Sequence, residues 1–411
     1  MRVIVWGINY APEVTGIAPF NTALCRYLSE AGHSVGMVTT FPYYPEWKKR
    51  AGDEGVVFRD EIDGKVAIHR CWHFVPEKPG ALKRVAHEAS FVITSFFRFL
   101  FLKRPDVFVV VSPPLLLGAA AWVLSVFKRV PFVFHVQDLQ PDAAFSLGMV
   151  NKAGVFSEVL YGLERLAYRK AARLSGISAG MLDAFKRKGV PEKKLLFFPN
   201  SAEFSRWVQR PPRGVFRGRM GWGKDDFLIV YSGNLGVKQG LSILLESAAL
   251  WEKSEMGAGR VVRWVLCGDG ALRGELEQKI RLEQLSFAHL IPLQSEEGFA
   301  EMMADADICA VSERPGAGAS FLPSKLLTCL ACGRPALLVA DEKSEMVRLN
   351  REKKFGVHAE PSPRYIVSAV REIISASTEL AACAKRGEEW VRQFDQKLVL
   401  DNFASELKKL I

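Results

Sequence analysis

Short apolar runs rich in Val, Ile and Phe alternate with helix-length segments along the whole chain. Such runs are typical of strands that are buried on both faces of a parallel sheet. In the first half the pattern predicts strands at Val3–Ile8, Val35–Thr40, Val66–Cys71, Val107–Ser112, Phe132–Val136 and Leu174–Ile177. The alternation of strand and helix indicates an α/β fold, with a Rossmann-like domain over residues 1–200.

A second series of the same kind begins after QRPPRGVFRGRMGWGKDD, a segment whose Pro, Gly and charged residues are typical of a linker. It predicts strands at Phe227–Ser232, Arg263–Cys267, Ala288–Pro292, Ile308–Val311 and Pro335–Val339. We expect a second Rossmann-like domain over residues 201–385, facing the first across a ligand cleft. The helical segment 386–411 is expected to cross back onto the first domain.

Composition narrows the class of protein further. The 411 residues are 49% hydrophobic and 24% charged, as in a globular protein, and no apolar run reaches the roughly 18 residues that span a bilayer. Seven scattered cysteines indicate reduced thiols and a cytoplasmic location. The net charge of +10 fits a phosphorylated small molecule or an anionic membrane. No nucleic-acid-binding module is recognisable, so nucleic acid is not an expected partner.

Three glycine-rich loops of the second domain follow predicted strands and precede helices. In YSGNLGVKQGL, Gly233 and its neighbours let the backbone approach a ligand, and Lys238 adds a positive charge, which suits a diphosphate. In GASFLPSKLL, Pro323 marks the first turn of a helix whose preceding amides and Lys325 suit an anion. The third loop, CGDG, contains Gly268 and Asp269. The first and the third of these loops could instead be tight structural turns.

Two segments of the first domain place polar residues after a strand. FHVQDLQPD ends a strand with His135 and Asp138, and NYAPEVTG follows the first strand. Such positions face the crevice where α/β folds bind ligands. For His135 the alternative is a hydrogen-bonded core histidine. No residues have the spacing of metal ligands.

The motifs INYAPEVTGIAPFN, TTFPYYPEW, VQDLQPD, YSGNLGVKQGL, CGDG and FLPSKLL together resemble the retaining glycosyltransferases of family 4, which have the GT-B fold. The likeness is greatest to the colanic-acid type of bacterial exopolysaccharide synthesis. It implies catalytic roles for His135, Lys238 and Lys325, and an acceptor-side position for Asp138. The donor-binding residues it implies are Glu13, Gly16, Gly233, Asn234, Gly268, Asp269, Ser320, Phe321, Leu322, Ser324 and Thr328.

The chain departs from that family at charged positions. Asn234 stands where many relatives have an arginine, and Ser320 and Thr328 stand where the family has two glutamates. None of the three can supply the charge that the family uses there. The departure leaves a non-catalytic nucleotide-sugar-binding subunit as one alternative, and a nucleotide-sugar epimerase as another.

The resemblance implies transfer of a hexosyl group from a UDP- or GDP-sugar to a saccharide hydroxyl, with retention and without a metal cofactor. Electrostatic stabilisation of the departing diphosphate would be the main task of the protein. The implied acceptor is lipid-linked. The segment Lys83–Arg104 has basic ends around an apolar run, so it could lie on the inner face of the cytoplasmic membrane or simply dock on the first domain.

Overall fold

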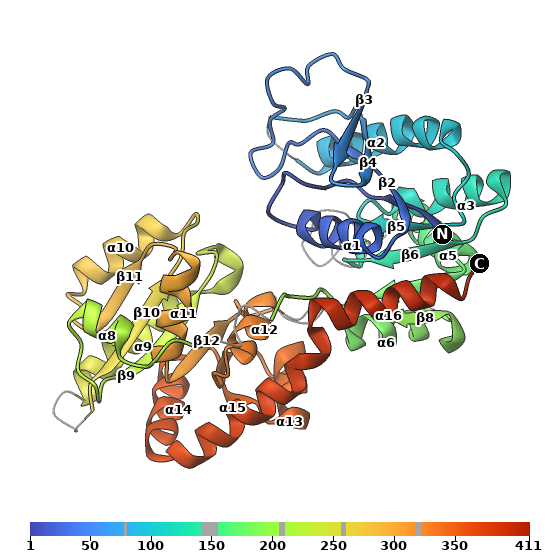
Figure 1. Cartoon of the computed structure of the whole chain (residues 1–411). Helices are drawn as coiled ribbons and strands as arrows, with labels where there is room; N and C mark the ends of the chain where they lie inside the picture. Colours follow the sequence, from blue (N-terminus) through green and yellow to red (C-terminus); the bar gives the residue numbers. More distant parts are fainter. Residues whose placement is uncertain (78–79, 141–154, 205–209, 256–259, 317–322) are drawn as a thin grey trace. The chain divides into compact units, whose positions relative to one another are not determined.

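The computed structural model describes residues 1–77, 80–140, 155–204, 210–255, 260–316 and 323–411. The chain forms two compact units, residues 1–200 with 397–411 and residues 201–396. Each unit is a sheet with helices on both faces (Figure 1). The predicted α/β class with two parallel-sheet domains is confirmed. The second unit extends to Gln396 rather than to residue 385.

In its described residues the first unit has a sheet of eight strands in the order β3-β4-β2-β1-β5-β6-β7-β8. Its strands are β1 (Arg2–Trp6), β2 (Ser34–Thr40), β3 (Phe58–Asp63), β4 (Val66–Cys71), β5 (Val107–Ser112), β6 (Phe132–Val136), β7 (Arg173–Gly176) and β8 (Leu195–Phe197). All neighbours pair in parallel except β3 and β4. β1 ends before Ile8, whose carbonyl accepts a hydrogen bond from the Thr39 hydroxyl (3.0 Å).

Helices cover both faces of this sheet. They are α1 (Ala18–Glu30), α2 (Ala81–Phe101), α3 (Leu116–Lys128), α5 (Val155–Lys170), α6 (Ala179–Arg187) and the chain-terminal α16 (Gln396–Lys408), with a 3-10 turn η1 (Glu192–Lys194). One apolar cluster includes Trp6 of β1 and Phe91 and Phe99 of α2. The other, on the opposite face of β1, includes residues of α1 and α16. The last helix therefore completes the core of the first unit.

The second unit has six described strands, all parallel, in the order β11-β10-β9-β12-β13-β14. They are β9 (Phe227–Ser232), β10 (Val262–Cys267), β11 (Ala288–Ile291), β12 (Ile308–Ser312), β13 (Ala336–Val339) and β14 (Gly356–Ala359). The helices are α8 (Val215–Met220), α9 (Ser242–Glu255), α10 (Arg273–Leu282), α11 (Glu296–Asp305), α12 (Ser324–Ala331), α13 (Glu345–Lys353), α14 (Pro363–Ser375) and α15 (Ser377–Val391), with 3-10 turns η2 (Val237–Gln239) and η3 (Arg392–Phe394).

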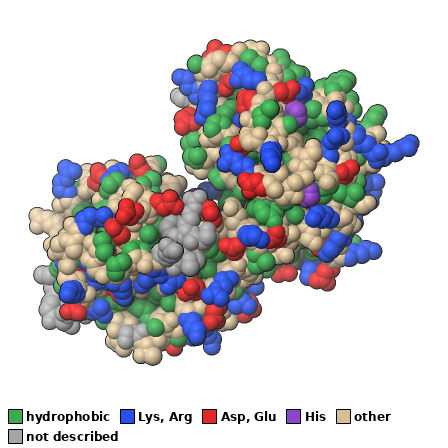
Figure 2. Space-filling model, viewed as in Figure 1, with side chains coloured by type: hydrophobic (Ala, Val, Ile, Leu, Met, Phe, Trp, Pro, Cys, Tyr) green, Lys and Arg blue, Asp and Glu red, His purple; other side chains and the backbone are tan. Residues whose placement is uncertain are grey.

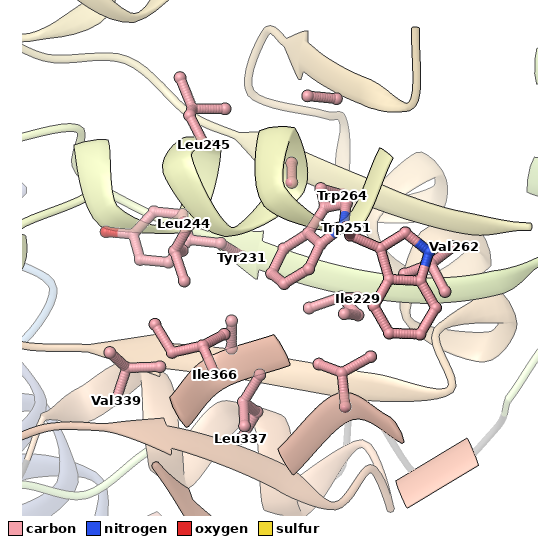
Figure 3. Packing of buried hydrophobic residues seen from close by; sticks show 14 of the residues in the cluster. Ile229, Tyr231, Leu244, Leu245, Trp251, Val262, Trp264, Leu337, Val339 and Ile366 are labelled. Atoms are coloured by element: carbon pink, nitrogen blue, oxygen red, sulfur yellow. The ribbon is translucent and has the colours of Figure 1, made fainter. Parts of the chain in front are cut away.

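A large apolar cluster fills the space between this sheet and its helices. Trp251 of α9 and Trp264 of β10 lie together in it, and Ile366 of α14 packs nearby (Figure 3). Tyr231 of β9 belongs to the same cluster and is 1% exposed. Its hydroxyl points away from the two tryptophans, toward the end of its strand (Figure 3).

Three strands were not predicted from the sequence. β3, with the sequence FRDEID, is an antiparallel edge strand whose residues are exposed or half-buried, so it lacks an apolar run. β8 and β14 have only three and four residues, and each lies at the end of its sheet. Edge strands need less apolar surface than central ones, and their hydrophobic pattern is correspondingly weak.

Candidate functional site

The strand order reverses once in each sheet. In the first unit β2, β3 and β4 lie on one side of β1, and β5 begins the series on its other side. In the second unit β10 and β11 lie on one side of β9, and β12 begins the series on its other side. Parallel α/β sheets bind ligands beyond the carboxyl ends of the strands at such a switch point. The glycine-containing loop after β1 and the loops after β9 and β12 lie at these two places.

A cavity of about 400 Å³ opens at the switch point of the second unit. β9 and β12 pair only at Ile308↔Ile229 and Cys309↔Val230, and no pairing is formed beyond them. The cavity is lined by Val230, Ser232, Gly233, Asn234, Gln239, Phe299, Met303, Cys309, Ala310, Val311, Ser324, Lys325, Thr328 and Cys329. Lys325 is the one charged side chain among these described residues.

Tyr231 holds Lys325 at the cavity wall. The Lys325 ammonium donates a hydrogen bond to the Tyr231 hydroxyl (2.5 Å) and lies 4.4 Å from the centre of its ring. The hydroxyl in turn donates to the Asn234 carbonyl (2.7 Å). Burial lowers the pKa of Lys325 to about 8, which leaves it mostly protonated at neutral pH. Tyr231 was not predicted as a site residue because a tyrosine in an apolar strand indicates core packing.

Two glycine loops fit closely against each other beside this cavity. A Cβ on Gly268 would lie 1.9 Å from the Gly233 carbonyl oxygen, and a Cβ on Gly270 would lie 2.5 Å from Asn234 Oδ1. The Leu235 amide donates to the Asp269 carbonyl (2.8 Å). Gly268 is therefore required for loop packing, and the Asp269 side chain accepts a hydrogen bond from the Gly270 amide.

The remaining predicted residues of this unit fall into three groups. Lys238 lies exposed in η2, next to the cavity-lining Gln239, and its carbonyl accepts from the Arg314 amide (2.8 Å). Ser324 and Thr328 line the cavity from α12. Ser320, Phe321 and Leu322 lie outside the described residues. Pro323 is the N-cap of α12 rather than a residue of its first turn, because its ψ of 129° is extended.

In the first unit, Gly16 lies exposed in the loop after β1 with a φ of +64°. This left-handed backbone conformation favours glycine. Glu13 of the same loop is 7% exposed, and its carboxylate accepts hydrogen bonds from the amides of Tyr43 (2.9 Å) and Tyr44 (2.8 Å) and from the Asn9 side chain (2.8 Å). Glu13 therefore fastens the Gly16 loop to the segment after β2.

His135 at the end of β6 is buried and uses both ring nitrogens inside the domain. Nδ1 lies 2.9 Å from the Ser175 hydroxyl and Nε2 lies 2.8 Å from the Gln137 amide nitrogen. Burial lowers the pKa of His135 to about 3, so the ring is neutral at physiological pH. This environment does not suit a general base. Asp138, three residues along, is exposed.

Helix α2, which contains most of the segment Lys83–Arg104, is both docked and exposed. Phe91 and Phe99 are fully buried, and Ser95 accepts a hydrogen bond from the Trp6 indole (2.9 Å). On another side of the helix, Ile93, Phe97 and Phe101 are 53–82% exposed. No helix among the described residues is long and apolar enough to cross a membrane.

The described residues contain no group of three or more His, Cys, Asp or Glu side chains that could hold a metal ion. All seven cysteines are free and buried. The pair Cys329 and Cys332 packs in the core of the second unit.

Two family models match this chain. The glycosyl transferase 4-like domain matches residues 15–201, and glycosyl transferases group 1 matches residues 213–390. Over 99% of the chain and 100% of the relative, the sequence is 29% identical to a putative colanic acid biosynthesis glycosyl transferase, WcaI, of Escherichia coli K12.

Solved structures share the fold at low sequence identity. Sucrose-phosphate synthase from Thermosynechococcus elongatus superposes with a TM-score of 0.71 at 15% identity, covering 100% of this chain and 98% of the other. HepE of Anabaena, solved in complex with UDP-glucose, gives a TM-score of 0.67 at 16% identity and full coverage of both chains.

Proposed function

Because the chain belongs to the family 4 glycosyltransferases of GT-B fold, we propose that it transfers a hexosyl group from a UDP- or GDP-sugar to a lipid-linked saccharide, with retention at the anomeric carbon. The process we propose is bacterial surface or exopolysaccharide synthesis, as in the colanic acid relative. The UDP-glucose in HepE supports a nucleotide sugar as the donor.

The observation that carries this proposal is the charged lysine at the wall of the switch-point cavity. Lys325 is anchored by Tyr231 and faces a space lined by hydroxyl, amide and apolar groups. A diphosphate leaving group gains negative charge as the glycosidic bond breaks, and a preorganised ammonium stabilises that charge. Lys238 adds a second positive charge from the exposed turn beside the cavity.

In this proposal Gly16, Glu13 and His135 of the first unit hold a loop or a side chain in place and do not react themselves. The glycine at position 16 keeps the loop after β1 in its left-handed turn, and Glu13 fixes that loop to its neighbour. His135 orients Gln137 at the end of β6 and transfers no proton itself. The proton of the acceptor hydroxyl goes to the leaving phosphate oxygen, and we propose no metal cofactor. Asp138 is assigned to the acceptor side.

We place the acceptor at a membrane surface because of the exposed side of α2. Ile93, Phe97 and Phe101 recur every four residues, and α3 packs beside α2 with Val126 and Phe127 61% and 74% exposed. Figure 2 shows hydrophobic side chains interspersed with Lys and Arg on this part of the first unit. Arg98 interrupts the apolar run in the sequence. In the structure its guanidinium forms an ion pair with Asp60 of β3 (2.5 Å). Lys103 and Arg104 are exposed beside the end of the helix.

Calorimetric titration with UDP-, GDP- and dTDP-sugars and the free nucleotides tests the donor site. We expect one nucleotide to be preferred, and Lys325→Ala to weaken its binding by roughly tenfold to a hundredfold, the usual range for a hydrogen bond to a charged group. Lys238→Ala is expected to weaken binding less. Lys253→Ala, an exposed lysine near the end of α9, is the matched control.

Product analysis then separates the alternatives. A transferase needs both donor and lipid-linked acceptor, and NMR of the new linkage reports whether the anomeric configuration is retained. An epimerase would convert the donor alone, and a binding subunit would bind without turnover. Failure of the wild type to bind any nucleotide would contradict the donor site itself.

A further inference from the structure

Basic residues stand at the amino ends of four neighbouring strands of the first sheet. β5, β6, β7 and β8 lie side by side and pair in parallel, so their amino ends meet at one edge of that sheet. Each strand begins with basic residues or comes shortly after them. These residues form what we call the basic edge: Lys103, Arg104, Lys128, Arg129, Arg169, Lys170, Arg173, Lys193 and Lys194.

Hydrogen bonds hold the segments of the basic edge together. The Lys128 ammonium donates to two carbonyls at the end of α2 (2.9 Å each), and the Lys194 ammonium donates to two carbonyls at the end of α5 (2.8 and 3.0 Å). The Arg104 guanidinium donates to the Arg129 carbonyl (2.8 Å). Lys128 and Lys194 therefore have a structural role, and these contacts bring the ends of α2, α3 and α5 to the same edge.

The other cations of the basic edge form no ion pair among the described residues. All of them are exposed except Arg173, which is half-buried. The two carboxylates nearest to them in sequence are engaged elsewhere, since Asp106 accepts from the Arg2 amide (2.6 Å) and Glu192 pairs with Lys186 (2.8 Å). The edge therefore presents uncompensated positive charge to any anionic surface that meets it.

Neighbouring like charges act on Lys194 in the middle of this group. Burial lowers its pKa, and the positive charges of Lys193, Arg173 and Lys170 lower it further. Cations from α5, β7 and η1 thus lie close enough to repel one another. Figure 2 shows Lys and Arg side chains gathered on the side of the first unit where Figure 1 places the two chain termini.

Exposed apolar side chains accompany the basic edge. Phe101 is 82% exposed and comes two residues before Lys103, while Val126 and Phe127 (61% and 74% exposed) come directly before Lys128. The interface of an anionic bilayer takes up aromatic side chains and attracts cations through its headgroups. A nucleic acid duplex or another soluble polyanion would pair with the cations but would leave these apolar side chains in water.

We propose that the basic edge binds the phosphate headgroups of an anionic bilayer, with Phe101 and Phe127 entering the interface beside it. The inference deepens the membrane placement in the proposed function and rests on that function for its role in catalysis. It extends the membrane contact from α2 to the amino ends of β7 and β8. This edge is opposite to the strand ends that are followed by Gly16 and Asp138, so a bilayer bound there leaves those loops uncovered.

Co-sedimentation with vesicles of equal parts phosphatidylglycerol and phosphatidylcholine tests the part of the basic edge that α2 does not contribute. In the double variant Arg169→Glu and Lys193→Glu we expect vesicle binding to fall at least about tenfold, because two attractive charges become repulsive. Both side chains are exposed and form no ion pair among the described residues, so the fold should be retained. Unchanged binding of this variant would overturn the proposal.

The double variant Lys253→Glu and Lys385→Glu is the matched control. It changes the net charge by the same amount, at exposed positions on α9 and α15 of the second unit. Its vesicle binding should equal that of the wild type. Equal losses in the two double variants would show that total charge alone governs the attraction, and would contradict a role for the basic edge.

Titration with a short DNA duplex in the same buffer decides between a bilayer and a soluble polyanion. We expect the wild type to bind the duplex at least about tenfold more weakly than the vesicles, because the duplex offers nothing to Phe101 and Phe127. Equally tight binding of both, lost together in Arg169→Glu and Lys193→Glu, would refute a specific bilayer contact.

Nucleotide titration separates this inference from the proposed function. Both double variants should bind the preferred nucleotide as the wild type does, which also shows that they are folded. A wild type that bound nucleotide and no vesicles would overturn the inference and leave the donor site standing. A wild type that bound vesicles through the basic edge and no nucleotide would contradict the proposed function alone.

Discussion

Gly268 shows how closely two loops approach each other beside the cavity of the second unit. We expect Gly268→Ala to destabilise the protein by at least about 2 kcal/mol, because its Cβ would lie 1.9 Å from a backbone oxygen that cannot move without shifting the loop after β9. Urea unfolding followed by tryptophan fluorescence measures the loss of free energy.

Gly274→Ala is the matched control for that substitution. Gly274 lies in α10, and a Cβ added there would have no atom within 4 Å, so alanine should stabilise the helix by about 0.5–1 kcal/mol. Equal effects of the two substitutions would refute the close approach at Gly268.

At the same scale, His135 makes the stability of the first unit depend on pH. In the unfolded chain the ring binds a proton below its ordinary pKa near 6.5, whereas the folded ring stays neutral down to about 3. The unfolded state therefore binds more protons in this window, and stability falls as the pH is lowered through it. We expect His135 to contribute a loss of about 2 kcal/mol between pH 7 and pH 5.

The measurement is the free energy of unfolding of wild type and His135→Gln at both pH values. The variant should lose about 2 kcal/mol less than the wild type between them. Other buried histidines, His73 among them, also have lowered pKa values. They account for the pH dependence of stability that remains in the variant. If the free energy of unfolding of wild type and variant depended on pH in the same way, the conclusion that the buried His135 ring is neutral would be wrong.

Among the elements, α2 has two separate apolar sides. One packs against β1 and holds the Trp6 indole through Ser95, so the helix belongs to the fold of the first unit. The other exposes Ile93, Phe97 and Phe101 beside α3. An exposed apolar surface next to cations suits the membrane-surface position proposed above. The two alternatives left open by the sequence are therefore compatible.

We expect the double substitution Phe97→Ser and Phe101→Ser to weaken binding to vesicles of phosphatidylglycerol and phosphatidylcholine at least about tenfold, since two exposed aromatic side chains would no longer enter the bilayer. Co-sedimentation measures the bound fraction. Vesicles of phosphatidylcholine alone should bind the wild type less, because Lys103 and Arg104 then lack anionic partners.

The matched control carries Leu282→Ser and Leu293→Ser, which remove exposed leucines of the second unit (72% and 63% exposed). Its binding should equal that of the wild type. Equal loss in both double variants would show that general surface hydrophobicity, and not the α2 surface, governs binding.

At the scale of the whole molecule, the chain leaves the first unit after Asn200 and returns to it at Lys397. Helix α16 then covers one face of the first sheet, and Phe403 stacks on Phe198 with 3.8 Å between ring centres. The end of the chain is thus needed to complete a core that begins with its first strand.

Phe403→Ala should lower the stability of the first unit by about 3–5 kcal/mol, the usual cost of emptying a buried aromatic site. Hydrogen exchange with mass spectrometry should show faster exchange in β1 and α1 and unchanged exchange in the second unit. Ser405→Ala, an exposed position on the same helix, should change stability by no more than about 0.5 kcal/mol. Faster exchange in both units would contradict the independence of their cores.

The sequence by itself determined the fold class and the family. Val107–Ser112, Phe132–Val136 and Phe227–Ser232 are strands with the bounds that were predicted, because strands buried on both faces need continuous apolar runs. Glycine loops after strands likewise indicated where a ligand site could form. Edge strand β3 was missed because four of its six residues are charged and all six are exposed or half-buried.

Only the tertiary structure decided what each polar side chain meets. Glu13 meets the Tyr43 amide, His135 meets the Ser175 hydroxyl, and Lys325 meets the Tyr231 hydroxyl, and in each pair the two residues are distant in sequence. Such contacts depend on the strand order and on where strand pairing ends, and neither of these produces a local pattern in the sequence. Apolar periodicity specifies a sheet, whereas the electrostatics of its cavity arise from contacts between segments far apart in the chain.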